Sequence, residues 1–330
     1  MKARILIGDA RKRLAELPSG SVRTCITSPP YFGLRDYGES DQMGLEETPD
    51  AYVEEMVLLF REVRRVLADD GTLWLNLGDS YAGSGKGRNA DGSAGKSGTL
   101  NKGNMGTQIG SLKKADIDLP AKNLIGIPWK VAFALQADGW ILRQDIIWAK
   151  PNPMPESVTD RCTKSHEYVF LLSKSARYYY DHVAVKEPIA DSTIGRTKRG
   201  VSSENKNING APGQTKHSLA QPRDYDADRP VAEFRNKRDV WTIASKPFKG
   251  AHFAVMPEAL VEPCVLSGSE AGDTVLDPFT GSGTVAVVAL QHGRNFVGTE
   301  LNPEYGEIAK DRITKTAPMF NEVVIDDEMV

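Results

Sequence analysis

The stretch LDPFTGSGT, Leu276–Thr284, decides the fold of this chain. The residues DTVL at 273–276 predict a strand that leads into the turn, and TVAVVALQHG at 284–293 follows it with the spacing of a helix. Gly281 and Gly283 allow the backbone to turn tightly and to pass close to a ligand, as in nucleotide-binding α/β proteins. An acid, Asp277, begins the turn and would repel a phosphate, so the stretch favours a ligand that carries an ammonium group. It predicts a strand, a glycine turn and a helix that together hold a cofactor.

Two further acids end predicted strands that belong beside this turn. The strand at 295–301 ends in Glu300, at the position where an acid commonly accepts hydrogen bonds from ribose hydroxyls. The helix at 303–315 should lead into another such strand, but the chain nearly ends there. The strand ARILIGD at 3–9, which ends in Asp9, supplies it from the other end of the chain. The sequence therefore predicts a circular permutation, in which Asp9 accepts a hydrogen bond from an adenine amino group or caps the next helix.

The remaining predicted elements alternate between strands and helices, which is typical of an α/β fold with a mostly parallel, doubly wound sheet. A length of 330 residues suits one large domain that carries an insertion. Helices are predicted at 10–18, 51–67, 123–139 and 303–315, and strands at 22–28, 71–79, 140–151 and 167–175.

Positive charge is concentrated in two loop-like segments, although the formal net charge of the whole chain is −3. The segment 81–114 holds six Lys or Arg residues and one acid, and its many glycines leave too little apolar surface for a core. The segment 186–249 holds thirteen Lys or Arg residues and eight acids. We expect a mobile loop at 81–115 and phosphate contacts from both segments, because phosphate neutralisation dominates nucleic-acid binding.

Cys25, Cys162 and Cys264 are far apart in the sequence and form no CxxC pair. This pattern argues against a disulfide framework and a zinc knuckle, and it fits a reducing compartment. No cluster of His, Cys and Asp has the spacing of metal ligands, so no catalytic metal is expected. Neither a signal peptide nor an apolar run of membrane-spanning length is found, and a cytoplasmic protein is expected.

A second stretch, TCITSPPYFGLRDYG at 24–38, joins an apolar strand to a stiff corner of serine, two prolines and tyrosine. Together with DPFTGSGT, its segment TSPPYFGLRDYG resembles the bacterial and phage DNA amino-methyltransferases, in the permuted motif order called the beta class. The segments at 143–174 and 252–263 match the same family order. The resemblance covers most of the chain and is weakest at 81–120 and 186–240.

The resemblance implies a Rossmann-like, circularly permuted fold that uses S-adenosyl-L-methionine as methyl donor and double-stranded DNA as substrate. It divides the chain into a catalytic half at 1–183, a target-recognition insertion at 184–248 and a cofactor-binding half at 249–330. The family also allows a homodimer, a cognate restriction endonuclease and a location at the nucleoid. The residues that match its cofactor contacts are Asp9, Thr27, His252, Pro257, Asp277, Phe279, Gly281, Gly283, Thr284 and Glu300.

The corner at Ser28 suits methyl transfer to an exocyclic amino group, whose lone pair is delocalised into the base. The Ser28 hydroxyl and the Pro29 carbonyl would accept hydrogen bonds from the amine. Pro30 would stiffen the corner, and Tyr31 would offer a flat face to a base flipped out of the duplex. In the family a serine before Pro-Pro-Tyr is associated with N4 of cytosine and an aspartate with N6 of adenine. We therefore expect N4 of cytosine as the target, with N6 of adenine as the alternative.

Other interpretations stay open at this point. An RNA or protein-amide methyltransferase would share the fold, but the protein-amide enzymes usually carry Asn where Ser28 stands, and neither class needs a basic insertion. A DNA-binding protein with a relic cofactor pocket would not need an intact Asp277. Trp148 and His166 match family positions, although a core tryptophan and a hydrogen-bonded histidine are simpler interpretations. His252 is equally well a residue at the start of a helix.

Overall fold

The computed structural model describes residues 1–34, 39, 41–82, 118–199, 231–245, 255–316 and 322–327. The chain forms two compact units, the first comprising Met1–Asp181 and Asp239–Val330 and the second His182–Arg238. The predicted loop at 81–115 lies almost wholly outside the described residues, as does much of the segment 184–248. Target recognition by that segment stays a prediction.

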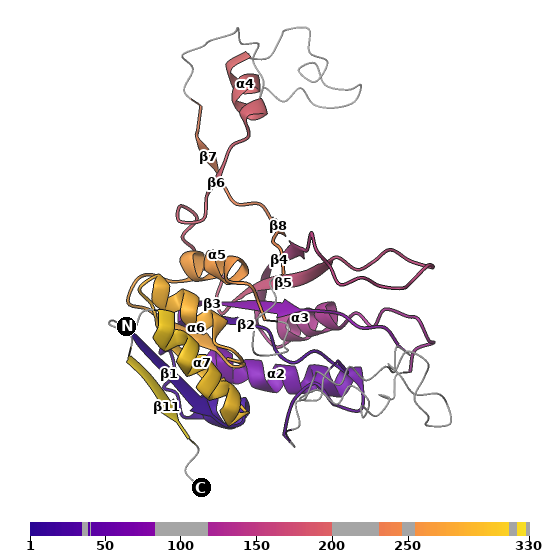
Figure 1. The fold of residues 1–330 in the computed structure, drawn as a ribbon, viewed down its shortest axis with the longest axis vertical. Helices are drawn as coiled ribbons and strands as arrows, with labels where there is room; N and C mark the ends of the chain where they lie inside the picture. The colour runs from indigo at the N-terminus through magenta and orange to yellow at the C-terminus, as the bar shows by residue number, and fades with distance from the viewer. Residues whose placement is uncertain are drawn as a thin grey trace. The chain divides into compact units, whose positions relative to one another are not determined.

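Nine strands of the described residues form one sheet in the first unit (Figure 1). They are β1 (Lys2–Ile7), β2 (Val22–Thr27), β3 (Leu67–Leu77), β4 (Ile141–Ala149), β5 (His166–Ser173), β8 (Val240–Thr242), β9 (Thr274–Asp277), β10 (Asn295–Glu300) and β11 (Glu322–Asp326). Their order in the sheet is β11-β1-β10-β9-β2-β3-β5-β4-β8. Neighbouring strands run parallel except at β5, which is antiparallel to β3 and β4. The predicted mostly parallel sheet is confirmed.

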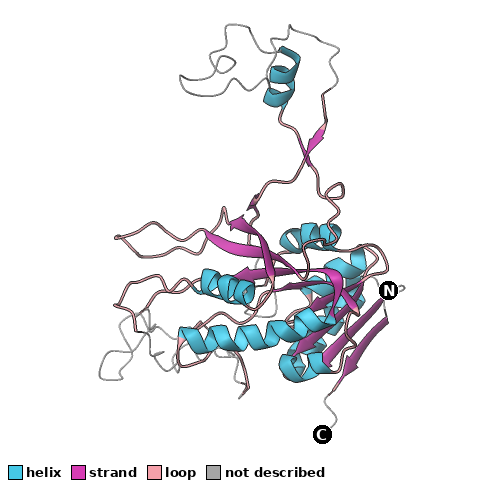
Figure 2. Ribbon diagram, turned by 180° about the vertical axis from the view of Figure 1, so that it is seen from behind, coloured by secondary structure: helices cyan, strands magenta, loops and turns pink. Residues whose placement is uncertain are grey.

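Two layers of helices cover the two faces of this sheet (Figure 2). One layer contains α1 (Ala10–Ala15), α2 (Pro49–Val66) and α3 (Ile127–Ala137), and the other α5 (Glu258–Gly268), α6 (Thr284–Gln291) and α7 (Pro303–Thr316). Side chains alternate along each strand, so β1 gives Leu6 to the first hydrophobic core and Ile5 and Ile7 to the second. Because both faces are covered, most side chains on both sides of the central strands are buried, and the predicted doubly wound arrangement is confirmed.

The permuted order places the two sequence motifs at one edge of the sheet. β9 pairs with β10 through Asp277 opposite Gly298, and β10 pairs with β1 through Glu300 opposite Ile7. β2, which leads into the Ser-Pro-Pro-Tyr corner, lies on the other side of β9. The carboxyl ends of these parallel strands meet where the strand order reverses, which is where α/β proteins bind ligands. The predicted circular permutation is therefore present in the structure.

The structure differs from the sequence-based expectation near the C-terminus, at α5 and at β8, which pairs with β4 in the main sheet although its residues lie in the segment 186–249 expected to be loop-like. The short segment after the helix predicted at 303–315 contains β11, which pairs in parallel with β1. Val323 and Ile325 of this strand pack against the second core, but a pattern this short among acids does not identify a strand. α5 is not among the helices predicted above by their ranges, and it continues through Pro263, although proline normally ends a helix. For the other predicted elements of the first unit, the observed bounds lie within four residues of the predicted ones.

The second unit contains ordered elements where the sequence predicts an irregular insertion. β6 (Glu187–Pro188) pairs antiparallel with β7 (Phe234–Arg235), and α4 (Asp191–Arg199) follows β6 in the chain. Glu187 accepts hydrogen bonds from Arg235 at 2.9 Å and from Arg238 at 2.7 Å. These charge-assisted bonds hold the two short strands together.

Candidate active site

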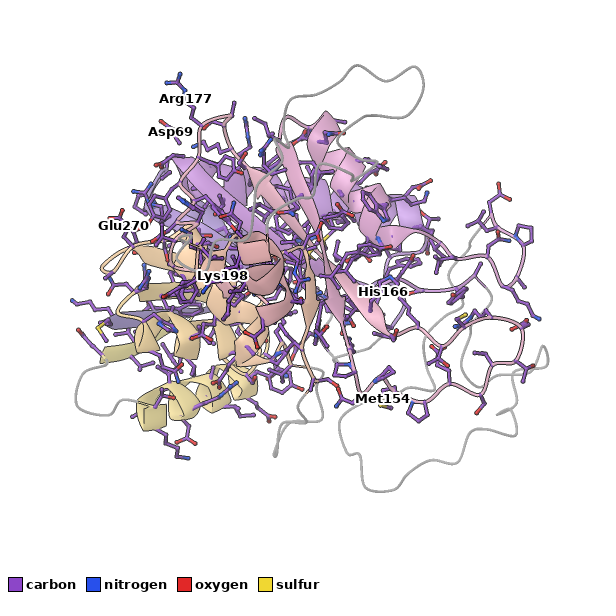
Figure 3. The ribbon with its side chains drawn as sticks, turned by 90° about the horizontal axis from the view of Figure 1, so that it is seen from above. Asp69, Met154, His166, Arg177, Lys198 and Glu270 are labelled. Carbon is purple, nitrogen blue, oxygen red and sulfur yellow. The ribbon has the colours of Figure 1, made fainter. Side chains whose placement is uncertain are left out.

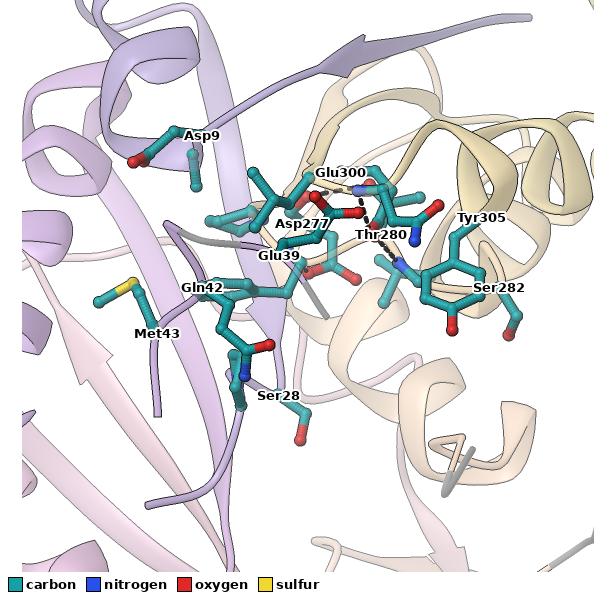
Figure 4. Close-up of a pocket in the computed structure, with 18 of the residues that line it drawn as sticks. Asp9, Ser28, Glu39, Gln42, Met43, Asp277, Thr280, Ser282, Glu300 and Tyr305 are labelled. Carbon is teal, nitrogen blue, oxygen red and sulfur yellow. Dashed lines mark hydrogen bonds between the residues drawn. The ribbon is translucent and has the colours of Figure 1, made fainter. Parts of the chain in front are cut away.

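Two adjoining pockets lie at the carboxyl ends of the central strands. The first contains the glycine turn and the acids that end β9 and β10 (Figure 4). The second contains the Ser-Pro-Pro-Tyr corner that follows β2. Ser28, Val255 and Met256 line both pockets. The corner and the glycine turn therefore form one continuous site, as their positions in the sheet predict.

Asp277 lines the first pocket and is only 2% exposed. Its Oδ1 accepts hydrogen bonds from the Thr27 hydroxyl at 2.7 Å and from the Phe279 amide at 3.0 Å. Burial raises the pKa of Asp277 to about 7, although these two hydrogen bonds oppose the shift. No cation among the described residues pairs with this carboxylate. Its charge is therefore available to a positively charged ligand.

Glu300 ends β10 and holds the glycine turn in place. Its Oε2 accepts a hydrogen bond from the Gly281 amide at 2.8 Å, and its Oε1 accepts one from the Asn302 amide at 3.0 Å (Figure 4). Burial raises the pKa of Glu300, while these backbone hydrogen bonds lower it. The carboxylate is thus fixed by backbone amides at the wall of the pocket, where it can accept further hydrogen bonds from a ligand.

Asp9, Phe279 and Thr284 also line the first pocket. Asp9 is at the same time the N-cap of α1, because its Oδ1 accepts a hydrogen bond from the Arg11 amide at 2.8 Å. Burial raises the pKa of Asp9, but the hydrogen bonds and charge of Arg11 outweigh burial and lower it overall. The capping interpretation is thus observed, and a contact from Asp9 to adenine stays a prediction.

Three other predicted cofactor residues do not line this pocket. Thr27 contacts the buried acid of β9 rather than the pocket. Gly283 caps α6 with φ of 76°, and a Cβ there would lie 3.0 Å from the Cβ of Ala309 in α7. Close packing of the two helices therefore requires this glycine. Pro257 is the N-cap of α5, and His252 lies outside the described residues.

Some residues of the first pocket are not part of either sequence motif. Glu39 and Met43 come from the segment after the corner, and Tyr305 comes from α7. Arg312 in α7 donates a hydrogen bond to the Thr284 hydroxyl at 2.8 Å and so ties α7 to the start of α6. No spacing or composition marks these residues. The nearness of Glu39 and Met43 to the corner is the one signal that could have identified them.

The corner presents the carbonyl of Pro29, but not that of Pro30, as a free acceptor. The Pro30 carbonyl accepts a hydrogen bond from the Tyr52 hydroxyl at 2.9 Å. Among the described residues no donor contacts the Pro29 carbonyl. Pro29 lines the second pocket beside Ser28, and Pro30 lines the first. The predicted pair of acceptors, the Ser28 hydroxyl and the Pro29 carbonyl, therefore belongs to the same pocket.

A chain of hydrogen bonds leads from Ser28 to a carboxylate that the sequence motifs do not include. The Ser28 hydroxyl donates to the Tyr31 hydroxyl at 3.3 Å, which donates to Glu167 Oε2 at 2.8 Å. Asn76 Nδ2 donates to the same oxygen at 3.3 Å, and Lys150 forms an ion pair with Glu167 Oε1. Burial and the charge of Glu167 raise the pKa of Tyr31 well above its usual value, so the phenol keeps its proton. The long contact from Ser28 to Tyr31 orients the Ser28 hydroxyl so that its oxygen can accept a hydrogen bond.

Trp148 lines the second pocket, whereas His166 does not. The indole of Trp148 donates to a backbone carbonyl at 2.8 Å, and the Lys150 ammonium lies 4.1 Å from its ring centroid. His166 begins β5 (Figure 3) and packs edge-on against Tyr168, with ring centroids 5.3 Å apart. Because side chains alternate along a strand, the neighbour of His166, Glu167, faces the pocket. The family match at His166 therefore lies one residue from a side chain that lines the second pocket.

Neither a metal site nor a membrane-spanning helix is found in the described part of the chain. No group of three or more His, Cys, Asp or Glu side chains there is placed to hold a metal ion. No helix of that part is both long and apolar enough to cross a bilayer. Cys25, Cys162 and Cys264 are all free thiols.

Residues 22–311 match the model of a protein family described as DNA methylase, N6_N4_Mtase. Type II methyltransferase M.Cfr9I from Citrobacter freundii is 45% identical over 311 residues, which cover 94% of this chain and 87% of the relative. Type II methyltransferase M.SmaI from Serratia marcescens is 44% identical over 313 residues, which cover 94% of this chain and 91% of the relative.

Two solved structures share the fold. TTHA0409 from Thermus thermophilus, solved in complex with S-adenosyl-L-methionine, covers 99% of both chains with 23% identity and a TM-score of 0.60. The cytosine-N4-specific PvuII DNA methyltransferase covers 99% of this chain and 95% of its own, with 18% identity and a TM-score of 0.60. The family model spans most of the chain, and the permuted sheet joins both motifs of that family in one site. This chain belongs to the DNA methylase family of N6 and N4 amino-methyltransferases.

Proposed function

We propose that this enzyme transfers a methyl group from S-adenosyl-L-methionine to N4 of a cytosine in a specific DNA sequence. The observation that carries the proposal is the meeting of the two pockets at Ser28. One pocket suits the cofactor, the other suits a flipped base, and their shared wall lets the two reactants approach each other. Holding reactants in line supplies much of the rate enhancement of such a transfer, without a covalent enzyme intermediate.

The chemistry of the first pocket fits S-adenosyl-L-methionine. The unpaired, buried carboxylate of Asp277 suits the ammonium of the methionine end. Glu300 suits the ribose hydroxyls, and Phe279 and Met43 add apolar surface for the adenine ring. The glycine turn at Gly281 lets the backbone approach the ligand closely. When bound, the cofactor supplies an electrophilic methyl carbon on its sulfonium.

The second pocket supplies acceptors for the amino group of the base. The Ser28 oxygen and the Pro29 carbonyl would accept one amine hydrogen each, which turns the nitrogen lone pair out of the ring and toward the methyl donor. As the bond between nitrogen and the methyl carbon forms, the bond between that carbon and sulfur would break, and the amine would release one of its two hydrogens to water as a proton. The contacts from Ser28 to Tyr31 at 3.3 Å and from Tyr31 to Glu167 at 2.8 Å favour Ser28 as an acceptor toward the base. Extrusion of the base costs a few kcal/mol, which contacts to the DNA backbone must offset.

Ser28 supports cytosine as the target base, by the family association of serine at this position with N4 methylation. N6 of adenine, by the same mechanism, is the alternative. Plasmid DNA methylated by the enzyme can be digested to nucleosides and analysed by mass spectrometry. We expect N4-methylcytosine; N6-methyladenine as the sole product would overturn the cytosine assignment. Methylome sequencing of a host that expresses the gene would give the recognition sequence.

Gly78, which follows β3, makes room for the ring of Tyr31. A Cβ at this position would lie 2.5 Å from Tyr31 Cε2 and 2.9 Å from Cδ2. We expect Gly78→Ala to displace the ring and to lower kcat at least about tenfold, since a misplaced reactant slows an aligned transfer. The affinity for S-adenosyl-L-methionine should not change, because Gly78 does not line the first pocket. Turnover and calorimetric titration measure the two effects, and wild-type turnover in the variant would contradict the role of the ring.

DNA binding should depend steeply on salt. The segments 81–114 and 186–249 carry the excess of positive charge, and contacts to several phosphates release as many counterions. We expect the affinity for duplex DNA to fall at least about 1,000-fold between about 50 and about 200 mM salt. Fluorescence anisotropy with a labelled duplex measures this slope, and an affinity independent of salt would refute phosphate binding by these segments.

The names of the relatives extend the proposal to the cell. M.Cfr9I and M.SmaI are Type II methyltransferases, and we propose that this enzyme likewise protects DNA against a cognate restriction endonuclease. It would act on DNA in the cytoplasm, at the nucleoid. A homodimer is a further prediction of the family resemblance, and light scattering of the purified protein tests it.

A further inference from the structure

Lys150 and Glu167 form an ion pair in the wall of the second pocket. The proposed mechanism uses Glu167 as the acceptor for Tyr31 but gives Lys150 no role. Their side chains are only 19% and 17% exposed. A partly buried ion pair adds little net stability, because the cost of removing two charges from water offsets most of their attraction. The strands β4 and β5 are already joined by a backbone ladder in this region. Stability alone therefore does not explain two charges at the surface of a pocket.

The ammonium of Lys150 is held in a fixed place and keeps donors free. Glu167 Oε1 fixes it from one side, and the ring of Trp148, 4.1 Å away, fixes it from another. Among the described residues, Glu167 is the only hydrogen-bond acceptor that contacts it. A lysine ammonium has three N–H groups, so N–H groups are left for a ligand of this pocket.

Through hydrogen bonds, Glu167 links the Lys150 ammonium to Ser28, where the amino group of the base would bind. Its Oε2 accepts the hydrogen bond from Tyr31, which accepts the one from Ser28. A cytosine with its amino group at Ser28 carries two acceptors along the same edge, the ring N3 and then O2. Adenine carries one acceptor, N1, and then a C–H group. A cation placed opposite the second of these two positions would distinguish the bases, because cytosine has the acceptor O2 there and adenine has a C–H group.

We infer that Lys150 donates a hydrogen bond to O2 of the flipped cytosine and that Glu167 positions Lys150 for this contact. Lys150 is then a specificity-determining residue. Glu167 is a positioning residue, because one of its oxygens holds Lys150 near O2 of the base and the other holds Tyr31, which contacts Ser28 near the amino group. The inference rests on the proposed function. It assigns the preference for cytosine to two residues outside the Ser-Pro-Pro-Tyr corner, in addition to Ser28.

The test combines a change in the enzyme with a change in the base. The substrates are two duplexes that differ at the target position: one carries dC, and the other a 2-aminopyridine C-nucleoside, which keeps the amino group and the ring nitrogen but lacks O2. Wild-type enzyme and Lys150→Met are compared on both substrates through kcat/KM. We expect the kcat/KM of the wild type to be about 10- to 100-fold lower on the analogue than on dC, the usual effect of losing a hydrogen bond to a charged group. Lys150→Met should show a similar loss on dC and almost no further loss on the analogue.

A merely structural role for Lys150 would give a different pattern. Lys150→Met would then lose activity by the same factor on both duplexes, and the wild-type preference for dC over the analogue would persist in the variant. That result overturns the inference. Lys130→Met is the matched control, because it removes an exposed ion pair with Asp50, 3.1 Å long, outside both pockets. If Lys150→Met does not fold, Lys150→Gln takes the same test with a neutral donor and should discriminate at an intermediate level.

The failure of this inference can be told apart from the failure of the proposed function. Wild-type enzyme that yields no N4-methylcytosine from the dC duplex refutes the function and, with it, the contact to O2. Wild-type enzyme that yields N4-methylcytosine, together with equal losses for Lys150→Met on both duplexes, refutes the contact alone. Glu167→Gln adds a third readout, since it should lower kcat without changing the affinity for S-adenosyl-L-methionine.

Discussion

Tyr31→Ala should lower kcat/KM for DNA methylation about 1,000-fold, while the dissociation constant of S-adenosyl-L-methionine changes less than about threefold. Tyr31 lines the second pocket and is absent from the lining of the first. The variant loses the ring face on which we propose that the base stacks, a contact of about 1–3 kcal/mol. It also loses the hydroxyl that accepts the proton of Ser28 at 3.3 Å, so the acceptor for the amine is no longer oriented. Both losses fall on the base rather than on the cofactor.

Tyr31→Phe separates the two contributions. Phenylalanine keeps the stacking face and removes the hydrogen bonds to Ser28 and Glu167. We expect an intermediate loss of about 10- to 50-fold, equivalent to the orientation of one acceptor. Steady-state kinetics and calorimetric titration with the cofactor provide the two measurements. Wild-type turnover in Tyr31→Ala, or a loss of cofactor affinity as large as the loss of turnover, would show that the ring does not hold the base.

Asp277→Asn should weaken binding of S-adenosyl-L-methionine about 30- to 1,000-fold, the usual cost of removing one partner of a buried charge pair. The amide keeps the shape of the side chain, and its oxygen can still accept from Thr27 and Phe279. It lacks the negative charge that would pair with the ammonium of the cofactor. Asp311→Asn is the matched control, because this exposed carboxylate of α7 pairs with Lys315 and lies outside both pockets.

The pH dependence of cofactor binding has a definite sign. Burial raises the pKa of Asp277 from 3.8 to about 7 in the protein without ligand. Below pH 7 the carboxyl group holds a proton, which must leave before it can pair with an ammonium. The affinity of the wild type should therefore rise up to about tenfold per pH unit below pH 7 and level off above it. Asp277→Asn should show no such rise, and a parallel rise in the variant would assign the pH dependence to another group.

The same substitution should make the free protein more stable at high pH. A folded-state pKa above the unfolded one means that ionisation of Asp277 opposes folding as the pH rises from 3.8 toward 7. The full penalty, present above pH 7, is about 4 kcal/mol. The melting temperature of Asp277→Asn should exceed that of the wild type, by more at pH 8 than at pH 5. A variant less stable than the wild type at pH 8 would show that the buried charge is compensated within the protein.

Much of the fold could be predicted because the signals that specify it are local. Strands covered on both faces bury most of their side chains and are rich in apolar residues. The two glycines that follow Asp277 indicate a tight turn between a strand and a helix. β11 and α5 escaped prediction for equally local reasons. The first is short and lies among acids, and the second contains Pro263. Their stability comes from packing on the sheet, which overrides local preference.

The sequence by itself determined the permuted order of the elements and the two corners that build the site, because each corner depends on its own residues. Only the tertiary structure decided which distant side chains complete these corners. Thr27 meets Asp277 across 250 residues, and Tyr31 meets Glu167 across 136. Side chains alternate along β5, so a shift of one residue in register would have turned His166 to the pocket and Glu167 away from it. Pairing between β5 and its neighbouring strands sets that register, so it cannot be predicted from the sequence of β5 alone.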